Sequence, residues 1–401
     1  MPNGDGSFGG FTMRVMIAGE PVPIDRAVFV ALLENSVVNG RAPYVHALEK
    51  SKIPYSELLE LARKAEVPHP LFFAPQAVVQ AQLRAKTAKL LQGVAPKTFT
   101  VNTRTTVELR DVELIVKDLL RKQDLARKHD PTLEKNAIVG LLRKPRPTVK
   151  EDAEALIKAL GLDRGAIRQA RKKETALELI IDRLEANQVF VSRSVRGFMP
   201  QLIEVHFSGM TVRDSKVPYI FLTGGDHGDF QEPAGRQIFT LVLMAVLVAR
   251  GIFAPISYDA HSTTPDAGRE YDIVGEILMP AAELQGVNLQ DLDDVKAAAA
   301  LFKVTPSALA VRGMRLGRLT PPTLTGYLDE LEEEFRARKK PGRTNQPKPV
   351  NAIKKYSGRE LTARMLRAVD DRRLTPREFC RVVCLNRIGP NDLGELKAAL
   401  R

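Results

Sequence analysis

The sequence has no tryptophan and only two cysteines among its 401 residues. So few cysteines exclude a disulfide-stabilised scaffold and are typical of a protein that works in a reducing cytoplasm. The start of the chain, from Met1 to Gly6, lacks the basic residues and the apolar run of a signal peptide. Charged residues make up 27% and hydrophobic residues 44%, which excludes a wholly disordered or fibrous chain. We therefore expect a cytoplasmic protein of two or three globular domains.

Acidic residues are scarce relative to basic ones. The chain has 60 Lys and Arg against 48 Asp and Glu, which leaves a formal net charge of +12. This excess favours an acidic partner, and composition alone leaves open whether that partner is a protein or a nucleic acid.

One long hydrophobic run, from Ile238 to Ile256, approaches the length of a membrane span. Gly251 and Pro255 interrupt it, and Arg250 would lie inside the bilayer at a substantial free-energy cost. The run is apolar on all sides, which predicts a buried helix in a globular domain rather than a membrane helix.

Residues 1–95 are expected to form a first, helix-turn-helix-like domain. The pattern predicts a strand from Phe11 to Ala18 and helices over about 24–36 and 55–66. Pro68 and Pro70 end the last helix, because proline disfavours helical geometry in the residue before it. A simple helical hairpin explains this stretch as well as a DNA-reading motif does.

The remainder divides into a helical connecting region (96–187), an α+β domain (188–335), a basic linker (336–357) and a helical C-terminal domain (358–401). The fold class is thus α+β and mostly helical, with a small sheet. The predicted strands are 188–192, 202–207 and 217–222. The predicted helices are 106–128, 132–142, 149–160, 172–187, 235–250, 269–284, 288–302 and 306–315.

Two runs carry a resemblance to a known family. Gly235–Leu247 reads GRQIFTLVLMAVL, and Arg269–Ala282 reads REYDIVGEILMPAA. Together with the segments Phe207–Met210 and Val217–Ile220, which look like that family's strand pair, they resemble the ImmA/IrrE family of zincin-like proteins. The resemblance implies a zincin-like core in which a His-Glu-x-x-His helix is followed by an acidic helix ending in Leu-Met-Pro.

The residues that such a zinc site needs are missing. Two histidines four residues apart share one helix face and bind zinc, and the glutamate between them serves as general base. The resemblance places Leu243 and Leu247 at the histidine positions, Met244 at the glutamate position and Ala267 at the third-ligand position, with Glu270 as an alternative. One carboxylate cannot hold Zn²⁺, so we expect a pseudo-peptidase with no catalytic residues, metal or cofactor.

A relocated metal site is the competing interpretation. Asp226, His227 and Asp229 share one loop, and Asp259 and His261 follow the apolar run. A glycine-rich Asp/His loop is more often a turn with Asx capping. We assign no role to the remaining histidines, and Cys380 and Cys384 are expected to be buried hydrophobic residues. Those other histidines are His46, His69, His129 and His206.

A basic stretch spans residues 336–359 and contains no acid. It is either a solvated linker or a flexible cationic arm that binds phosphates or an acidic protein surface. Its candidate binding residues are Arg336, Arg338, Lys339, Lys340, Arg343, Lys348, Lys354, Lys355 and Arg359.

The wider resemblance indicates a function. Glu60–Pro75 looks like the end of the repressor-type helix-turn-helix that precedes this core in a long subgroup, and Leu301–Gly317 looks like the helices that follow it. Long members of the subgroup look like antitoxins paired with a PIN-domain ribonuclease toxin, and some members act in prophage regulation or phage defence. We therefore expect a non-catalytic, antitoxin-like protein that masks an acidic PIN-type toxin and can also bind DNA. The alternatives are a divergent metallopeptidase and a prophage-type transcriptional regulator; the oligomeric state stays open.

Overall fold

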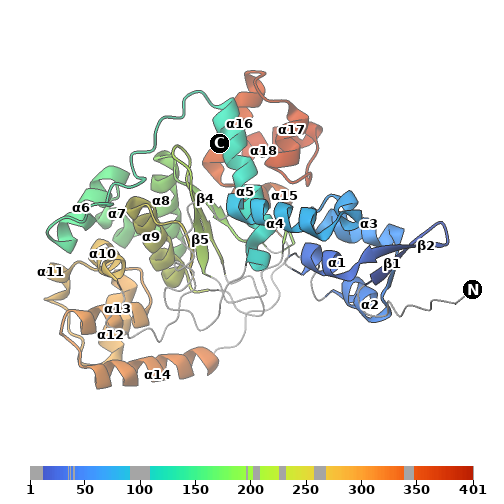
Figure 1. Ribbon diagram of the computed structural model, residues 1–401. Coiled ribbons are helices and arrows are strands. Elements are labelled where there is room, and N and C mark those ends of the chain that lie inside the picture. Colours follow the sequence, from blue (N-terminus) through green and yellow to red (C-terminus); the bar gives the residue numbers. More distant parts are fainter. Residues whose placement is uncertain are drawn as a thin grey trace, which may run out of the picture. The chain divides into compact units, whose positions relative to one another are not determined.

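A computed structural model of the chain describes residues 12–34, 36, 38, 41–90, 109–195, 197–201, 208–224, 232–256, 268–337 and 347–400. The chain splits into two compact units, coloured along the sequence in Figure 1. The first comprises Met1–Gln92 and Glu108–Lys117, and the second comprises Gly93–Val107 and Asp118–Arg401.

The first unit is built on a small mixed sheet. Its strands are β1 (Thr12–Ile17), β2 (Glu20–Asp25) and β3 (Lys52–Pro54), in the order β2-β1-β3. The hairpin between β1 and β2 turns at Ala18 and Gly19, both at positive φ, a geometry that matches the twist of the two strands. Met13 and Val15 are buried, and Thr12 and Arg14, which alternate with them, are exposed, as expected of a sheet with one face on the core.

Helices complete the first unit. They are α1 (Arg26–Leu33), α2 (Ala42–Lys50), α3 (Tyr55–Lys64), the 3-10 helix η1 (His69–Phe73) and α4 (Gln76–Leu90). Phe29 of α1 stacks on Tyr44 with ring centroids 5.7 Å apart and lies 6.0 Å from the ring of Phe72. A parallel pairing joins β1 to β3, and β3 separates α2 from α3. The strand predicted over residues 11–18 corresponds to β1, whereas β2 was not predicted: residues 20–25, which include two prolines, pair with β1 as a hairpin.

The second unit has a four-stranded sheet in the order β4-β6-β5-β7. β4 (Phe190–Arg193) runs parallel to β6 (Tyr219–Leu222), and β5 (Gly209–Val212) runs antiparallel to both β6 and β7 (Pro255–Ile256). Nearly every residue of β4, β5 and β6 is buried. A sheet buried on both faces loses the alternation of polar and apolar residues, and its strands read as short apolar runs.

Helices cover this sheet. On one side α8 (Lys173–Ala186) and the apolar α9 (Ala234–Arg250) pack on the strands, and α15 (Pro349–Ser357) packs on β4 (Figure 1). Further helices are α5 (Leu109–His129), α6 (Val149–Leu160), α7 (Arg164–Gln169), α10 (Arg269–Leu278), α11 (Ala281–Leu284), α12 (Leu292–Leu301), α13 (Pro306–Arg315) and α14 (Pro321–Ala337). The chain ends with α16 (Arg359–Asp370), α17 (Pro376–Val382), the 3-10 helix η3 (Pro390–Asp392) and α18 (Leu393–Leu400).

The predicted mostly helical α+β class is confirmed, and three local expectations need comment. The helix expected over 132–142 is absent, because the carboxylate of Asp130 and the amide oxygen of Asn136 accept bonds from backbone N–H groups two residues further on. The helix expected over 269–284 is two helices, since Pro280 separates α10 from α11. The strand expected over 202–207 lies outside the described residues.

The long apolar run behaves as predicted. α9 lies in the core of the second unit with most of its side chains buried, and Gly251 ends it at a φ of +75°. Across the described ranges, no helix combines the length and the apolar character that crossing a membrane requires.

Candidate functional site

The positions at which the resemblance expects a zinc site lie on α9. Leu243 and Met244 are buried in the main core cluster, and Leu247 is half-buried against it. A Cβ atom at Gly209 of β5 would lie 2.8 Å from the Met244 sulfur, so the thioether packs directly against the strand at that glycine. Apolar side chains therefore fill the space that an imidazole pair and a carboxylate would need.

The third-ligand candidates offer no substitute in the described structure. Glu270 on α10 forms an ion pair with Arg250, with 3.0 Å between Nε and Oε1, and both side chains are half-buried. Ala267 lies outside the described residues, as do Asp226, His227, Asp229, Asp259 and His261. Among the residues that the structure describes, no three His, Cys, Asp or Glu side chains are grouped as a metal site requires.

A buried charged cluster, which the sequence pattern did not reveal, lies beside β4 and β6. Lys122 of α5 is fully buried, its Nζ donates to Asp118 at 2.6 Å, and it lies 4.1 Å from the ring centroid of Tyr356 on α15. Burial lowers the pKa of Lys122, and the carboxylate of Asp118 opposes this shift. A spacing of four residues is common for exposed ion pairs on helices, and only the contact of Lys122 with Tyr356 shows that this face is buried.

Glu185, near the end of α8, is a second buried ionisable group. Its carboxylate accepts the backbone N–H of Glu360 at 3.1 Å and that of Val191 at 3.5 Å. A Cβ atom at Gly358 would lie 2.6 Å from this carboxylate, so a glycine is needed there for α16 to approach. Burial raises the pKa of Glu185 to about 7. One side chain thus connects α8, β4 and α16.

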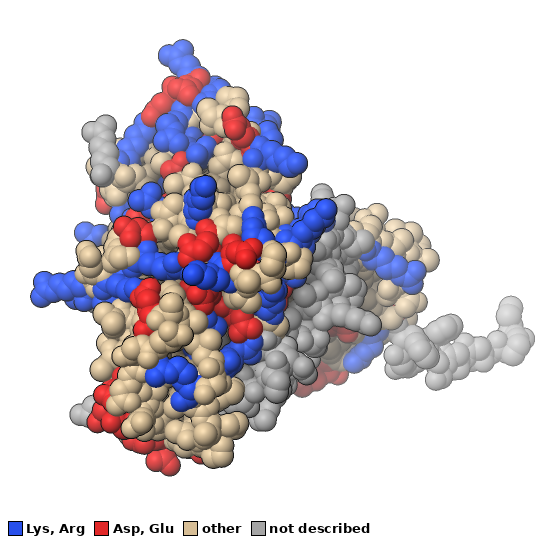
Figure 2. All heavy atoms as spheres, turned by 90° about the vertical axis from the view of Figure 1, so that its left-hand side faces the viewer, with Lys and Arg blue, Asp and Glu red and all other residues tan. Residues whose placement is uncertain are grey.

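The positive charge of the protein is concentrated at its C-terminal end. Residues 336–401 contain 18 Lys and Arg and six Asp and Glu, so their net charge of +12 equals that of the whole chain. Residues 1–335 are neutral on balance. Consistently, Figure 2 shows acidic and basic side chains interleaved over the face of the second unit that it presents.

The nine predicted binding residues do not form one free arm. Arg336 lies in the last turn of α14 and pairs with Glu332, Lys354 donates to the carbonyl of Ala399 at 3.0 Å, and Arg359 pairs with Glu178 at 3.2 Å. Lys348 is the residue before α15, and Lys355 is half-buried on that helix. The other four lie outside the described residues: Arg338, Lys339, Lys340 and Arg343.

The predicted linker is therefore corrected over part of its length. Residues 349–357 form α15, whose Val350, Ile353 and Tyr356 are buried. Proline at the first position of a helix is well tolerated, so Pro349 starts α15 rather than preventing it. The three-residue spacing of Val350, Ile353 and Tyr356 is typical of a helix with one buried face. The prolines and lysines around them favoured a linker instead, and the prediction followed the prolines and lysines.

The C-terminal helices carry exposed cations that sequence reasoning missed. Arg377 and Arg381 lie four residues apart on α17, and Arg372 lies in the turn before it; all three are exposed. Arg381 forms a long ion pair with Glu378, at 3.8 Å. We call Arg372, Arg377 and Arg381 the α17 basic face. The sequence does indicate further cations in this region, because the net charge of residues 336–401 is larger than the charge of the nine residues first considered.

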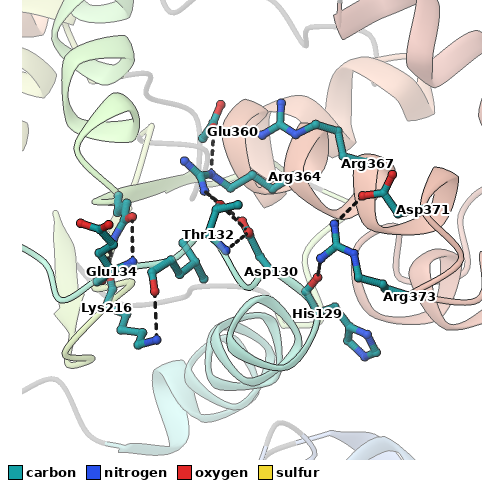
Figure 3. A network of polar contacts seen from close by, with 12 residues as sticks. His129, Asp130, Thr132, Glu134, Lys216, Glu360, Arg364, Arg367, Asp371 and Arg373 are labelled. Carbon is teal, nitrogen blue, oxygen red and sulfur yellow. Dashed lines mark hydrogen bonds and ion pairs between the residues drawn. The ribbon is translucent and has the colours of Figure 1, made fainter.

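A polar network joins α16 and the turn that follows it to the end of α5 (Figure 3). Arg364 of α16 donates to Asp130 at 2.9 Å and forms an ion pair with Glu360 at 2.6 Å, and Asp130 also accepts from the hydroxyl of Thr132. Arg373 pairs with Asp371 and donates to the carbonyl of His129. Burial raises the pKa of Asp130, but hydrogen bonds from Thr132 and Arg364 outweigh it and lower the pKa overall. The end of α5 thus holds α16 in a defined position.

These features were compared with known proteins. No protein-family model, curated protein or solved structure matched the chain.

Proposed function

We propose that this chain is a non-catalytic binding protein, a pseudo-peptidase that binds an acidic protein partner in the manner of an antitoxin. The observation that carries the proposal is Met244, whose sulfur packs against Gly209 at the position where the ImmA/IrrE resemblance expects the general base. A buried thioether neither takes up a proton nor binds zinc, and the neighbouring Leu243 and Leu247 cannot replace the lost imidazoles.

The charge distribution supports an acidic partner. The α17 basic face presents three exposed guanidinium groups, and residues 336–401 hold the net charge of the chain. Arginine binds carboxylates in bidentate geometry, and opposite charges on two proteins accelerate their association. A PIN-type ribonuclease, whose active site is a cluster of carboxylates, fits this surface and is the partner that the resemblance implies.

A pull-down from the native cell tests the proposal. The full chain, with an N-terminal tag and after nuclease treatment, is compared with the variant Arg377→Glu/Arg381→Glu. We expect the wild type to recover an acidic protein in equal stoichiometry and the variant to lose it. Lys150→Glu/Lys158→Glu, which reverses two exposed cations of α6, is the matched control and should retain the partner.

Three results would count against the proposal. An acidic partner that binds the α17 variant as well as the wild type would remove the α17 basic face as the interface. Recovery of DNA-dependent associations alone would favour a transcriptional regulator. Tightly bound metal in equal stoichiometry, measured on the purified chain by elemental analysis, would favour the divergent metallopeptidase with the Asp226–Asp229 loop as its site.

A further inference from the structure

A cavity in the second unit lies away from both features discussed above. It has a volume of about 830 Å³ and lies between the starts of α8, α9 and α13 on one side and α12 and α14 on the other. Small-molecule sites typically measure about 300–1,000 Å³ and combine apolar walls with a few convergent polar groups. The cavity has polar groups on one side and apolar side chains on the other.

Three helices begin at the floor of the cavity. A Cβ atom at Gly235 would lie 2.7 Å from the carbonyl carbon of Val304, so this glycine lets the start of α9 contact the residues that precede α13. Lys173, the first residue of α8, donates to the carbonyl of Val304 at 2.5 Å. The positive ends of three helix dipoles therefore converge around one residue.

Cationic side chains add to this positive potential. Lys172, Lys173 and Arg236 line the same floor. The pKa of Lys173 is lowered by burial and, to a smaller extent, by the charge of Lys303, and the carboxylate of Glu174 opposes this shift. In the described structure, neither Lys172 nor Pro233, the residues before α8 and α9, caps its helix through a side chain. The first N–H groups of these two helices therefore lack the usual side-chain acceptor.

The opposite wall, formed by α14, has apolar side chains and two acidic residues that are paired with cations. Leu328, Leu331 and Phe335 of α14 face the cavity, and Phe335 is 40% exposed. Two acids on the α14 wall have partners, Glu334 with Lys296 at 2.5 Å and Glu332 with Arg336. Glu174, at the start of α8, is the third acid that lines the cavity. The positive floor and the apolar wall thus face one another across a space large enough for a small molecule.

We propose that this cavity binds a small amphiphilic carboxylate, with the carboxylate on the floor beside Lys172 and Arg236 and the apolar chain along Leu331 and Phe335. Helix starts and basic side chains are effective sites for an anionic group, and the dipole repulsion among the three helices falls when an anion lies between them. The apolar chain removes exposed hydrophobic surface on α14 from water.

Calorimetric titration of the full chain with octanoate tests the proposal, with octan-1-ol and inorganic phosphate as comparison ligands. We expect octanoate to bind with one site per chain, and octan-1-ol, which has the chain without the charge, to bind about tenfold more weakly. Phosphate, which has the charge without the chain, should also bind more weakly than octanoate. Equal affinities for octanoate and octan-1-ol, or tighter binding of phosphate, would refute the proposed ligand.

Two variants locate the site. Arg236→Gln should weaken octanoate about tenfold and leave octan-1-ol unchanged, because it removes a charge-assisted contact to the carboxylate alone. Phe335→Glu should weaken both ligands, and Leu179→Glu, on an exposed apolar residue of α8 that does not line the cavity, should weaken neither. Octanoate binding that is indifferent to both cavity variants would place the ligand elsewhere and overturn the proposal. Circular dichroism of each variant verifies that the fold is retained.

Discussion

At the scale of single residues, burial changes the pKa of a charged side chain and the contacts that it needs. Lys122 and Glu185 are ordinary surface residues by composition, yet each is almost completely enclosed. A charged group removed from water needs partners, and the two residues obtain them differently. Lys122 pairs with Asp118, and Glu185 accepts backbone N–H groups from two other elements.

Glu185 makes the stability of the fold depend on pH. Its pKa is raised from 4.5 to about 7 in the folded chain, so the folded state holds a proton that the unfolded state has released between these values. Its contribution is complete below about pH 4.5 and is lost as the pH rises through about 7. We expect Glu185→Gln to remove up to about 3 kcal/mol of this pH dependence.

Denaturant unfolding of both proteins at pH 5 and pH 8 measures this effect. The free energy of unfolding of the wild type should fall more between the two pH values than that of Glu185→Gln. Equal pH dependence in the two proteins would show that the carboxyl group is already ionised in the folded state at pH 5.

At the scale of elements, a few buried polar contacts join helices that are distant in sequence. The pair Asp118–Lys122 on α5 lies under Tyr356 of α15, and Arg364 of α16 donates to Asp130 at a separation of 234 residues. Such contacts position the C-terminal helices on the sheet. At such a contact, replacing one of the two charged residues destabilises the fold more than replacing both, because a single buried charge is left without its partner.

The Asp118–Lys122 pair allows this asymmetry to be measured. Lys122→Met should destabilise the second unit by about 3–5 kcal/mol, because it leaves the carboxylate of Asp118 buried without its cation. Asp118→Leu/Lys122→Met should recover part of that loss. Unfolding free energies from the single and double variants form the double-mutant cycle, and additive losses would mean that the two charges do not interact.

The elements themselves were predicted with uneven success. The helices α6 and α9 were located to within a residue, because Thr148 caps the first and uninterrupted apolar character marks the second. Strand β1 was predicted, whereas strand β2 of the N-terminal unit and helix α15 were missed. In both cases local composition, charged or rich in proline, gave a weaker signal than the packing that the residues make once folded.

At the scale of the whole molecule, charge is distributed unequally along the chain. The last 66 residues hold the net charge of +12, and the rest is neutral on balance. Partner binding through the C-terminal helices should therefore depend on ionic strength. Salt shortens the screening length from about 10 Å at 0.1 M to about 3 Å at 1 M, which weakens attraction between exposed charges.

We expect recovery of the acidic partner in the pull-down to fall steadily as NaCl is raised from about 0.05 to 0.5 M. The measurement is the amount of partner eluted at each salt concentration from wild-type chain. Recovery that does not change with salt would indicate an interface dominated by apolar contacts, which the α17 basic face cannot supply.

The sequence by itself determined the mostly helical α+β class, the burial of α9 and the apolar character of its Leu243, Met244 and Leu247, because each depends on residue type and local periodicity. The tertiary structure alone decided which charged residues are buried, that residues 349–357 belong to the core and that three helix starts meet around Val304. These outcomes depend on contacts between residues far apart in the chain. The spacing of apolar residues along one or two helical turns contains no information about such contacts.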